Sequence, residues 1–380
     1  MKEKLLKFGS YVLVALLATV VTLAMVGMQA PSKLDRLETL IQERFIDEAD
    51  IQTIEDAAAS AMVKATGDRW SYYISAKDYA THQEQQENAY VGVGITIQQQ
   101  EEDAGFLIVM VTDGGSAQEA GIEVNDLLIG VEDQDVRGMT MEEVRQLVRG
   151  EEGTRVSLTV MRKGEHMTID VERRRIEETV ASGEMLENGI GLVRINNFDS
   201  RCAEESIQAI ESLRAAGAKK LILDVRNNPG GFADELVKLL DYLLPEGDLF
   251  RSVSYDGKEK VDTSDAAFLD MPMAVLVNSS SYSAAEFFAA ALQEYEAAVV
   301  VGEPTVGKGF YQQTIPLGDG SAVALSTGKY FTPKGNSLAG VGITPDIRVD
   351  VEEETAAQIY YGTLPTAEDP QIQAAVKALK

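Results

Sequence analysis

Histidine is scarce in this sequence: the 380 residues include only two, His82 and His166. Neither lies in the C-terminal half of the chain. A serine nucleophile in that half would therefore need a different general base, which argues against a Ser–His–Asp triad. Lysine is the remaining candidate, because a neutral amine held beside a hydroxyl group can accept its proton.

Cysteine is nearly absent as well. The single cysteine, Cys202, excludes an intrachain disulfide. It stands at the start of a predicted helix, Cys202–Ala216, and a thiol nucleophile there would lack a histidine partner, so we interpret it as a bystander. Clustered metal ligands are also lacking, and we expect no metal and no cofactor.

The sequence also lacks an excess of positive charge. The formal net charge is −27, whereas nucleic-acid and anionic-membrane surfaces require basic patches. We therefore expect no nucleic-acid partner. A hydrophobic content of 45% with 25% charged residues indicates a globular protein, and the length allows two or more domains.

The N-terminus contains a long stretch without charge. Lys2, Lys4 and Lys7 precede the uncharged run from Phe8 to Met28, which is long enough for a membrane-spanning helix. A cleaved signal peptide would have a shorter apolar core and a small-x-small site, and Pro31 directly after Ala30 disfavours cleavage. We expect residues 1–30 to form a cytoplasmic stub and a single-pass cell-membrane anchor. The positive charges then place the N-terminus in the cytoplasm and the rest of the chain outside it.

Helical patterns flank the central part of the sequence. Residues 31–89 begin with a helix whose apolar face holds Leu34, Leu37, Ile41 and Phe45, and a second helix is predicted over residues 51–65. Residues 351–380 form a tail that closes with a helix from about Asp369. These flanking helices are candidate contacts of a homodimer or another homo-oligomer.

Residues 90–177 show short alternating strands and two short helices. Strands are predicted at 106–111, 126–131, 156–161 and 167–171, and helices at 116–122 and 141–149. This order, with the phrase Ala-Gly-Ile-Glu-Val-Asn-Asp-Leu-Leu-Ile-Gly-Val, resembles a PDZ domain. Backbone N–H groups at a glycine-rich turn can hold a carboxylate, and the adjacent strand edge can accept an extended peptide. The predicted peptide-binding residues are Val91, Gly92, Val93, Gly94 and Ile95, although the two glycines could simply permit a bulge.

Residues 178–350 alternate strands and helices, which predicts an α/β domain. The expected strands are 190–195, 220–225, 273–277, 299–302, 310–316 and 322–327, and the expected helices are 202–216, 232–243 and 283–295. Such sheets place their chemistry where strands lead into helices. The multidomain α/β protein would thus consist of the anchor, the helical region, the PDZ-like domain, this domain and the tail.

Ser283 and Lys308 are the candidate nucleophile and general base. Ser283 begins a predicted helix, where free N–H groups favour developing negative charge, although serine is also a common N-cap. A lysine acting as base needs its pKa lowered by about two to three units, which burial can achieve, whereas a surface lysine would keep its ordinary pKa. Gln312 lies four residues beyond Lys308, and in a strand that spacing puts both on one side, where the amide can hold the amine.

A glycine turn, Asn227-Asn228-Pro229-Gly230-Gly231, follows the strand at 220–225. The N–H of Gly230 or Gly231, together with that of Ala284, can form an oxyanion hole. The turn is too short for a phosphate-binding loop and lacks its GK[ST] ending.

Together these segments resemble the C-terminal processing peptidases, also called tail-specific proteases. The matching stretches are Gly67–Tyr73, the PDZ phrase, Asp224–Gly231, the Ser283 and Lys308 segments, Tyr330–Gly335 and Val341–Asp346. The resemblance implies that Ser283 is the nucleophile, Lys308 the general base and Gln312 the residue that orients it. It also implies a catalytic core like the Clp protease and crotonase group, with a cap between this core and the PDZ domain.

The resemblance further implies that an arginine on the PDZ helix couples substrate binding to activity, and Arg149 or Arg145 could fill that place. The sequence departs from the family at Tyr282, where a small residue is usual, and at Arg69, where proline is common. Neither departure removes a catalytic group, but Tyr282 crowds the turn before the nucleophile.

We therefore expect a membrane-anchored serine endopeptidase that recognises free C-termini of extracytoplasmic proteins. Two alternatives come from other classes of function. A catalytically silent PDZ scaffold would bind tails without cutting them. A crotonase-like enzyme acting on a small thioester follows only from fold analogy and is disfavoured by the anchor and the PDZ domain.

Overall fold

A computed structural model describes residues 31–100 and 104–380. The predicted membrane anchor lies outside these described residues. Within them, no helix combines the length and the apolar character needed to cross a bilayer.

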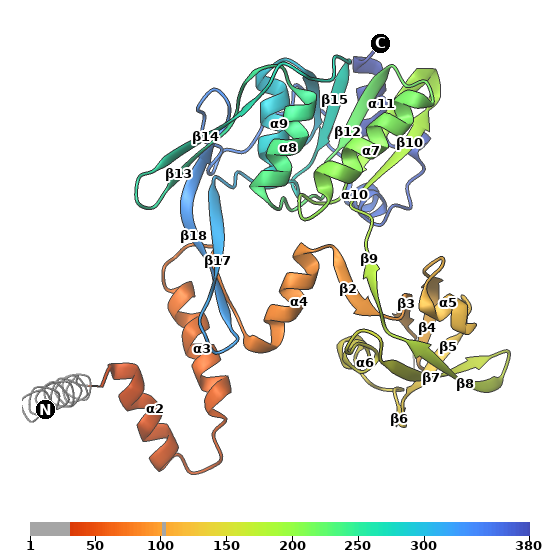
Figure 1. Cartoon of the computed structure of the whole chain (residues 1–380), viewed down its shortest axis with the longest axis vertical. Coiled ribbons are helices and arrows are strands. Elements are labelled where there is room, and N and C mark those ends of the chain that lie inside the picture. Colours follow the sequence, from red (N-terminus) through yellow and green to blue (C-terminus); the bar gives the residue numbers. More distant parts are fainter. Residues whose placement is uncertain (1–30, 101–103) are drawn as a thin grey trace, which may run out of the picture. The chain divides into compact units, whose positions relative to one another are not determined.

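The chain divides into two compact units, Met1–Tyr73 and Ile74–Lys380. In the first unit the structure describes two helices, α2 (Lys33–Arg44) and α3 (Ile51–Lys64), and most of the short strand β1 (Tyr72–Ile74) (Figure 1). Ser32 caps α2: its side chain accepts a bond from the Asp35 N–H, and the Asp35 carboxylate accepts one from the Ser32 N–H at 2.8 Å. Both helices predicted from the sequence are confirmed.

The second unit opens with helix α4 (Ala76–Gln86), which the sequence analysis missed, and continues into a PDZ fold. Strands β2 (Ala89–Gly92) and β9 (Arg174–Glu177) pair with each other where the chain enters and leaves this part. The PDZ sheet has the order β3 (Ile95–Gln99), β4 (Phe106–Val111), β5 (Leu127–Val131), β7 (Arg155–Arg162) and β8 (Glu165–Glu172), with β6 (Gln134–Asp135) beside β5. Helices α5 (Ser116–Ala120) and α6 (Met141–Val148) complete the fold.

A six-stranded, mostly parallel sheet forms the main core. Its order is β10 (Ala181–Leu186), β11 (Ile190–Ile195), β12 (Lys220–Asp224), β15 (Met273–Val277), β16 (Ala298–Gly302) and β19 (Ile347–Arg348). Only β10 runs antiparallel, against β11, and it forms one edge of the sheet.

Helices cover both faces of this sheet. Alternate strand residues such as Val193, Leu223 and Val275 pack against α7 (Cys202–Ala215), α8 (Ala233–Leu243) and α9 (Ala284–Glu294). Their neighbours, such as Leu192 and Ile222, pack against α11 (Pro370–Ala378). Because successive side chains of a strand point to opposite faces, the helices on both faces bury nearly every residue of the central strands, which explains their apolar runs.

The structure contains a second, antiparallel sheet that was not predicted from the sequence. Strands β17 (Phe310–Pro316) and β18 (Ala322–Phe331) were expected to finish the α/β domain, but they pair with each other, and β18 also pairs with β13 (Gly247–Ser254). Strand β14 (Glu259–Ser264) follows β13 in a hairpin that the sequence analysis missed. β15 is buried along its whole length, whereas β17 is half-buried or exposed, as expected for a sheet with one solvated face.

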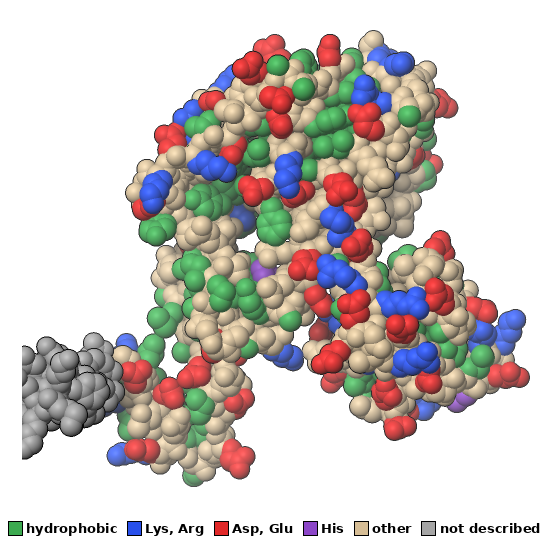
Figure 2. Space-filling view, viewed as in Figure 1, with side chains coloured by type: hydrophobic (Ala, Val, Ile, Leu, Met, Phe, Trp, Pro, Cys, Tyr) green, Lys and Arg blue, Asp and Glu red, His purple; other side chains and the backbone are tan. Residues whose placement is uncertain are grey.

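The chain ends with α10 (Glu353–Tyr360) and the predicted closing helix α11, which Asp369 caps. Short 3₁₀ turns lie at Glu187–Gly189 and Thr366–Glu368. On the face shown in Figure 2, acidic and basic side chains are interspersed over the described part of the chain.

Candidate active site

Ser283 lies at the turn that joins β15 to α9. Its backbone has φ +60° and ψ −127°, a conformation that costs a non-glycine residue energy, and only 6% of its surface is exposed. The turn is fixed by the segment that follows the neighbouring strand β12: the Ser281 hydroxyl donates to the Val225 carbonyl at 2.7 Å, and the Tyr282 N–H donates to the Asn228 carbonyl at 3.1 Å. A strained, buried serine at a helix N-terminus suits a nucleophile better than an ordinary N-cap.

The glycine turn packs directly on this serine. Gly230 has φ +91°, and a Cβ atom there would lie 2.7 Å from the Ser283 Cβ and 2.9 Å from the Ala284 nitrogen. Only glycine permits this approach. The structure thus brings together the residues predicted for the oxyanion hole. The Gly230 N–H donates to the Asn228 side chain at 2.8 Å, so the N–H of Ala284, the first residue of α9, is the better-placed donor.

Glu286 joins the serine turn to the lysine loop. Its carboxylate is completely buried and accepts bonds from the N–H groups of Ser283 at 3.0 Å, Lys308 at 2.9 Å and Gly307 at 2.7 Å. The Thr305 hydroxyl donates to the same group. Serine and lysine are 25 positions apart in the chain, and this carboxylate holds their backbones together. The sequence analysis assigned Glu286 no role; its position three residues after the candidate nucleophile, as in a capping box, was the available signal.

The side chain of Lys308 lies near Tyr282, a residue at which the sequence departs from the family pattern. Its ammonium nitrogen is 5.9 Å from the centre of the Tyr282 ring, a cation–π distance. Tyr282 therefore contacts the candidate general base as well as preceding the nucleophile, which was not anticipated from the sequence.

Strand alternation does not place Gln312 on the same side as Lys308, as the sequence analysis predicted. Lys308 lies outside β17, and the pairing of β17 with β18 shifts register between Tyr311 and Gln312. The argument that both side chains share a strand face therefore fails. The Gln312 amide donates to the Ser326 hydroxyl at 2.9 Å and to the Phe310 carbonyl at 3.2 Å. Its proposed orientation of Lys308 stays a prediction.

The hydroxyl of Ser283 shares a 2.8 Å hydrogen bond with the hydroxyl of Tyr330. Tyr330 is buried beside Phe287, Phe250 and Tyr311, with ring centres 4.5–6.0 Å apart. Burial raises the pKa of the Tyr330 phenol, so that it stays protonated at neutral pH. Sequence analysis did not assign Tyr330 to the site, because 47 positions separate the two hydroxyl groups.

The predicted peptide-binding residues 91–95 span the end of β2, a two-residue link and the start of β3. β2 ends at Gly92, β3 begins at Ile95, and Val93 is buried between them. The carbonyls of Val93 and Gly94 accept bonds from the N–H groups of Ala117 and Thr112 at 3.0 and 2.9 Å, which fixes the link.

The two candidate coupling arginines have different surroundings. Arg149 follows α6 directly, pairs with Glu84 of α4 at 3.0 Å and lies 5.4 Å from the Tyr90 ring centre. Arg145 pairs with Glu142 on the surface of α6. Only Arg149, of these two, reaches a neighbouring element through these contacts.

Asp199 lies in the turn after β11 and touches the glycine turn. A Cβ atom at Gly231, where φ is +149°, would come within 2.5 Å of the Asp199 nitrogen. Burial raises the pKa of the Asp199 carboxyl from its ordinary 3.8 to about 7.

We predict that Asp199→Asn makes folding stability less dependent on pH. The folded chain holds the Asp199 proton up to about pH 7, whereas the unfolded chain releases it near 3.8. Folding therefore binds a proton between these values, and stability falls as the pH rises through them, by an amount on the order of 2–4 kcal/mol. Denaturant unfolding at a series of pH values measures this loss. The Asn variant should gain stability relative to wild type at pH 8 but not at pH 4, and exposed Asp234→Asn is the control. Equal pH dependence in all three proteins would contradict the prediction.

We also predict that Glu286→Gln destabilises the protein. The amide keeps one acceptor oxygen but turns the other position into a donor, which leaves buried N–H groups of Ser283, Gly307 or Lys308 without an acceptor. The expected loss is roughly 2–4 kcal/mol of unfolding free energy. Chemical denaturation checks it, with Glu204→Gln on the exposed surface of α7 as the matched control. An unchanged unfolding midpoint would show that the carboxylate does not hold the two loops.

Comparison with known proteins agrees with this geometry. Residues 189–349 match the model for peptidase family S41, and residues 107–162 match a PDZ domain. The carboxy-terminal processing protease CtpA of Bacillus subtilis (strain 168) is 31% identical over 369 residues, which cover 93% of this chain and 79% of that protein. A probable CtpA-like serine protease of Staphylococcus aureus (strain COL) is 31% identical over 338 residues, covering 87% of this chain and 67% of that protein.

Among solved structures, a putative S41 protease from Bacteroides fragilis NCTC 9343 superposes with a TM-score of 0.52 at 17% identity, covering 92% of this chain and 97% of that chain. This likeness concerns the fold alone. The two sequence relatives and the matching family models together show the family. The chain belongs to peptidase family S41, among the carboxy-terminal processing serine proteases that carry a PDZ domain.

Proposed function

We propose that the protein is a membrane-anchored endopeptidase that uses a Ser283–Lys308 dyad to cut extracytoplasmic proteins. The PDZ domain binds the free C-terminus of a substrate, and the chain then extends to the active site. The observation that carries this proposal is the Glu286 carboxylate, which accepts bonds from the N–H groups of both Ser283 and Lys308. One buried group thereby ties the backbone of the nucleophile turn to that of the loop that carries the candidate base.

The reaction follows from the roles of these groups. Lys308, as a neutral amine, takes the proton of the Ser283 hydroxyl while the oxygen attacks the peptide carbonyl carbon. The N–H of Ala284, at the N-terminus of α9, and an N–H of the glycine turn stabilise the oxyanion. The Lys308 ammonium then gives its proton to the departing amine, which leaves an acyl-enzyme. Lys308 next takes a proton from water, and the resulting hydroxide attacks the acyl carbonyl carbon. The bond to the Ser283 oxygen then breaks, and the Lys308 ammonium returns its proton to that oxygen.

The hydrogen bond between Ser283 and Tyr330 affects the transfer of the serine proton to Lys308. A protonated phenol can both donate to and accept from the serine hydroxyl. The serine hydrogen must point toward the base before attack, and Tyr330 can then donate to the serine oxygen. The tyrosine is thus compatible with the proton transfer to Lys308 rather than a rival base.

Anchoring and location rest on the N-terminal sequence. Residues 8–28 carry no charge and follow three lysines, a pattern that favours insertion with the N-terminus in the cytoplasm. The large acidic remainder would then face the outside, where unfolded or extended protein tails are the substrates.

We predict that an unfolded protein with a free apolar C-terminus is cut by the detergent-solubilised wild-type chain, but not by Ser283→Ala or Lys308→Ala. Loss of either group removes the covalent route and should lower the rate by about 10³-fold or more. Gel analysis over time and labelling by a fluorophosphonate serine probe measure the two effects. Lys329→Ala, which removes an exposed lysine of β18, is the matched control.

Three outcomes separate the possible functions. Cutting by wild type and by the control alone supports the dyad. Cutting by Lys308→Ala at the wild-type rate would eliminate lysine as the base. Binding of the tail without cutting by any variant would favour the PDZ scaffold.

We further predict that the full chain remains in the membrane pellet after alkaline extraction. Leu17→Arg with Val20→Arg places two charges in the uncharged run, each costing about 2.5–3.5 kcal/mol at the centre of a span. The double variant should move to the soluble fraction, whereas Leu17→Ala with Val20→Ala should stay in the pellet. Wild-type protein in the soluble fraction would exclude the anchor.

A further inference from the structure

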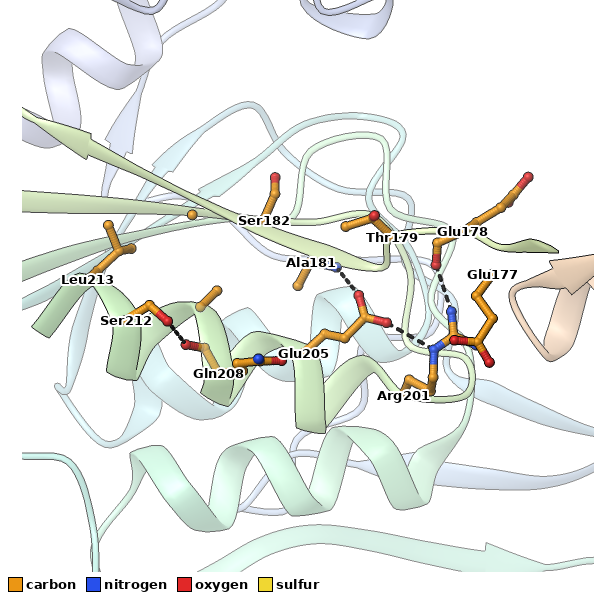
Figure 3. A pocket seen from close by; sticks show the side chains of 12 residues that line it. Glu177, Glu178, Thr179, Ala181, Ser182, Arg201, Glu205, Gln208, Ser212 and Leu213 are labelled. Carbon is orange, nitrogen blue, oxygen red and sulfur yellow. Dashed lines mark hydrogen bonds and ion pairs between the residues drawn. The ribbon is translucent and has the colours of Figure 1, made fainter. Parts of the chain in front are cut away.

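One arginine, Arg201, binds both places where the chain crosses between the catalytic core and the PDZ domain. Its guanidinium donates to the carbonyls of Glu87 at 2.9 Å and Asn88 at 3.2 Å, just before β2. It also donates to the carbonyl of Glu178 at 2.7 Å, just after β9 (Figure 3). The incoming and the outgoing crossing are therefore held by the same side chain.

Arg201 is itself fixed in place. Its backbone has φ +71°, a left-handed conformation that a non-glycine residue seldom adopts, at the N-cap of α7. The Glu205 carboxylate one turn later accepts its Nε–H at 2.9 Å and also accepts the N–H groups of Val180 and Ala181 at 2.7 and 3.2 Å. Figure 3 shows Arg201 and Glu205 at one end of a cavity of about 600 Å³ between β10 and α7. Hydrogen bonds of Arg201 and Glu205 thus hold the crossings at this end of the cavity.

A second contact ties the incoming crossing to the turn that precedes Arg201. Asn88, which is buried and has φ +50°, exchanges amide hydrogen bonds with Asn197 at 3.2 and 2.6 Å. Its amide also donates to the Ser200 carbonyl at 3.0 Å. Any displacement of this crossing therefore pulls on the turn formed by residues 196–200.

The same turn is bonded to the candidate oxyanion loop. The Phe198 N–H donates to the Gly230 carbonyl at 2.7 Å, and the Phe232 N–H donates to the Phe198 carbonyl at 2.8 Å. A Cβ atom at Gly231 would lie 2.3 Å from the Phe198 carbonyl carbon, so no spare space separates the two segments. Gly230 in turn contacts Ser283 and Ala284. A continuous path of hydrogen bonds and close backbone contacts therefore runs from the two crossings to the candidate nucleophile.

We propose that Arg201 is a positioning residue that couples the PDZ domain to the oxyanion loop, by clamping both crossings to the 196–200 turn that holds Gly230 and Gly231. Arg201 touches neither the peptide site nor the nucleophile. Peptide binding to the PDZ domain changes the position of the two crossings. The hydrogen bonds of Arg201 transmit that change to the 196–200 turn, which positions the Gly230–Gly231 backbone relative to Ala284. The inference rests on the function proposed above and adds a route for its regulation.

The test compares Arg201→Gln and Arg201→Lys with wild type in the full chain. Lysine keeps the charge but cannot offer the planar fork that serves three carbonyls. For cleavage of an unfolded protein with a free apolar C-terminus, both variants should lower kcat by about fivefold or more, while KM and the Kd for a peptide of the same C-terminal sequence stay within about twofold of wild type. Arg214→Gln, which removes an exposed arginine of the same helix, should leave all three values unchanged.

A second measurement does not depend on the stability of the arginine variants. In the uncut Ser283→Ala chain, adding the peptide should change amide hydrogen exchange of Phe198 and Phe232 by about threefold or more, and the amidated peptide should not. Introducing Arg201→Lys into the Ser283→Ala chain should abolish this change in hydrogen exchange on addition of the peptide.

The outcomes are distinct. Wild-type kcat in both arginine variants, or no exchange response at Phe198 and Phe232 in Ser283→Ala, overturns the coupling and leaves the protease intact. A rise of KM and Kd with unchanged kcat also overturns it, because Arg201 would then shape the peptide site. A wild-type chain that neither cuts nor reacts with the serine probe removes the proposed function, and the coupling with it.

Discussion

The catalytic part of this protein depends on one buried carboxylate. Glu286 lies one turn into α9, and its two oxygens accept bonds from Ser283, Thr305, Gly307 and Lys308. A buried acceptor that satisfies this many donors is costly to replace, because every unpaired N–H would lose hydration without compensation. The strained backbone of Ser283 persists because this group and the packed Gly230 leave it no alternative. The backbones of the candidate nucleophile and the candidate base, 25 positions apart in the chain, thereby share one hydrogen-bond acceptor.

The parallel sheet supplies the frame for that contact. β12 and β15 are neighbours and run in the same direction, so their carboxyl ends place the glycine turn and the serine turn side by side. Arg226, two residues after the end of β12, forms a buried ion pair with Asp369 at the start of α11 and another with Asp224. The tail helix is thus part of the support of the glycine turn, and the hydrogen bonds of Phe198 support the turn from the other side. In the adjoining turn, burial raises the pKa of Asp199, which links the protonation of its carboxyl to folding stability.

Regular elements were the most predictable part of the structure. β11, β15 and β17 have the bounds predicted from their apolar runs and flanking turns, and α6 and α7 end within one residue of the prediction. The prediction missed α4, because its sequence of polar residues shows no apolar stripe, and it missed the β13–β14 hairpin. The Asp256–Gly257 pair at that hairpin was a usable signal. The separate antiparallel sheet could not be predicted, because the pairing of β18 with β13 joins segments far apart in the chain.

The sequence by itself determined the residue types and therefore the chemistry available: a serine and a lysine without a nearby histidine, glycines where the backbone must pass closely, and motifs that match peptidase family S41. Those properties are local, since residue identity and short-range spacing encode them. The tertiary structure alone decided which groups meet. The hydroxyl of Tyr330 on Ser283, the carboxylate of Glu286 on the lysine loop and the guanidinium of Arg201 on two distant crossings are contacts across long stretches of chain. Such contacts depend on how helices and sheets pack, which no local pattern specifies.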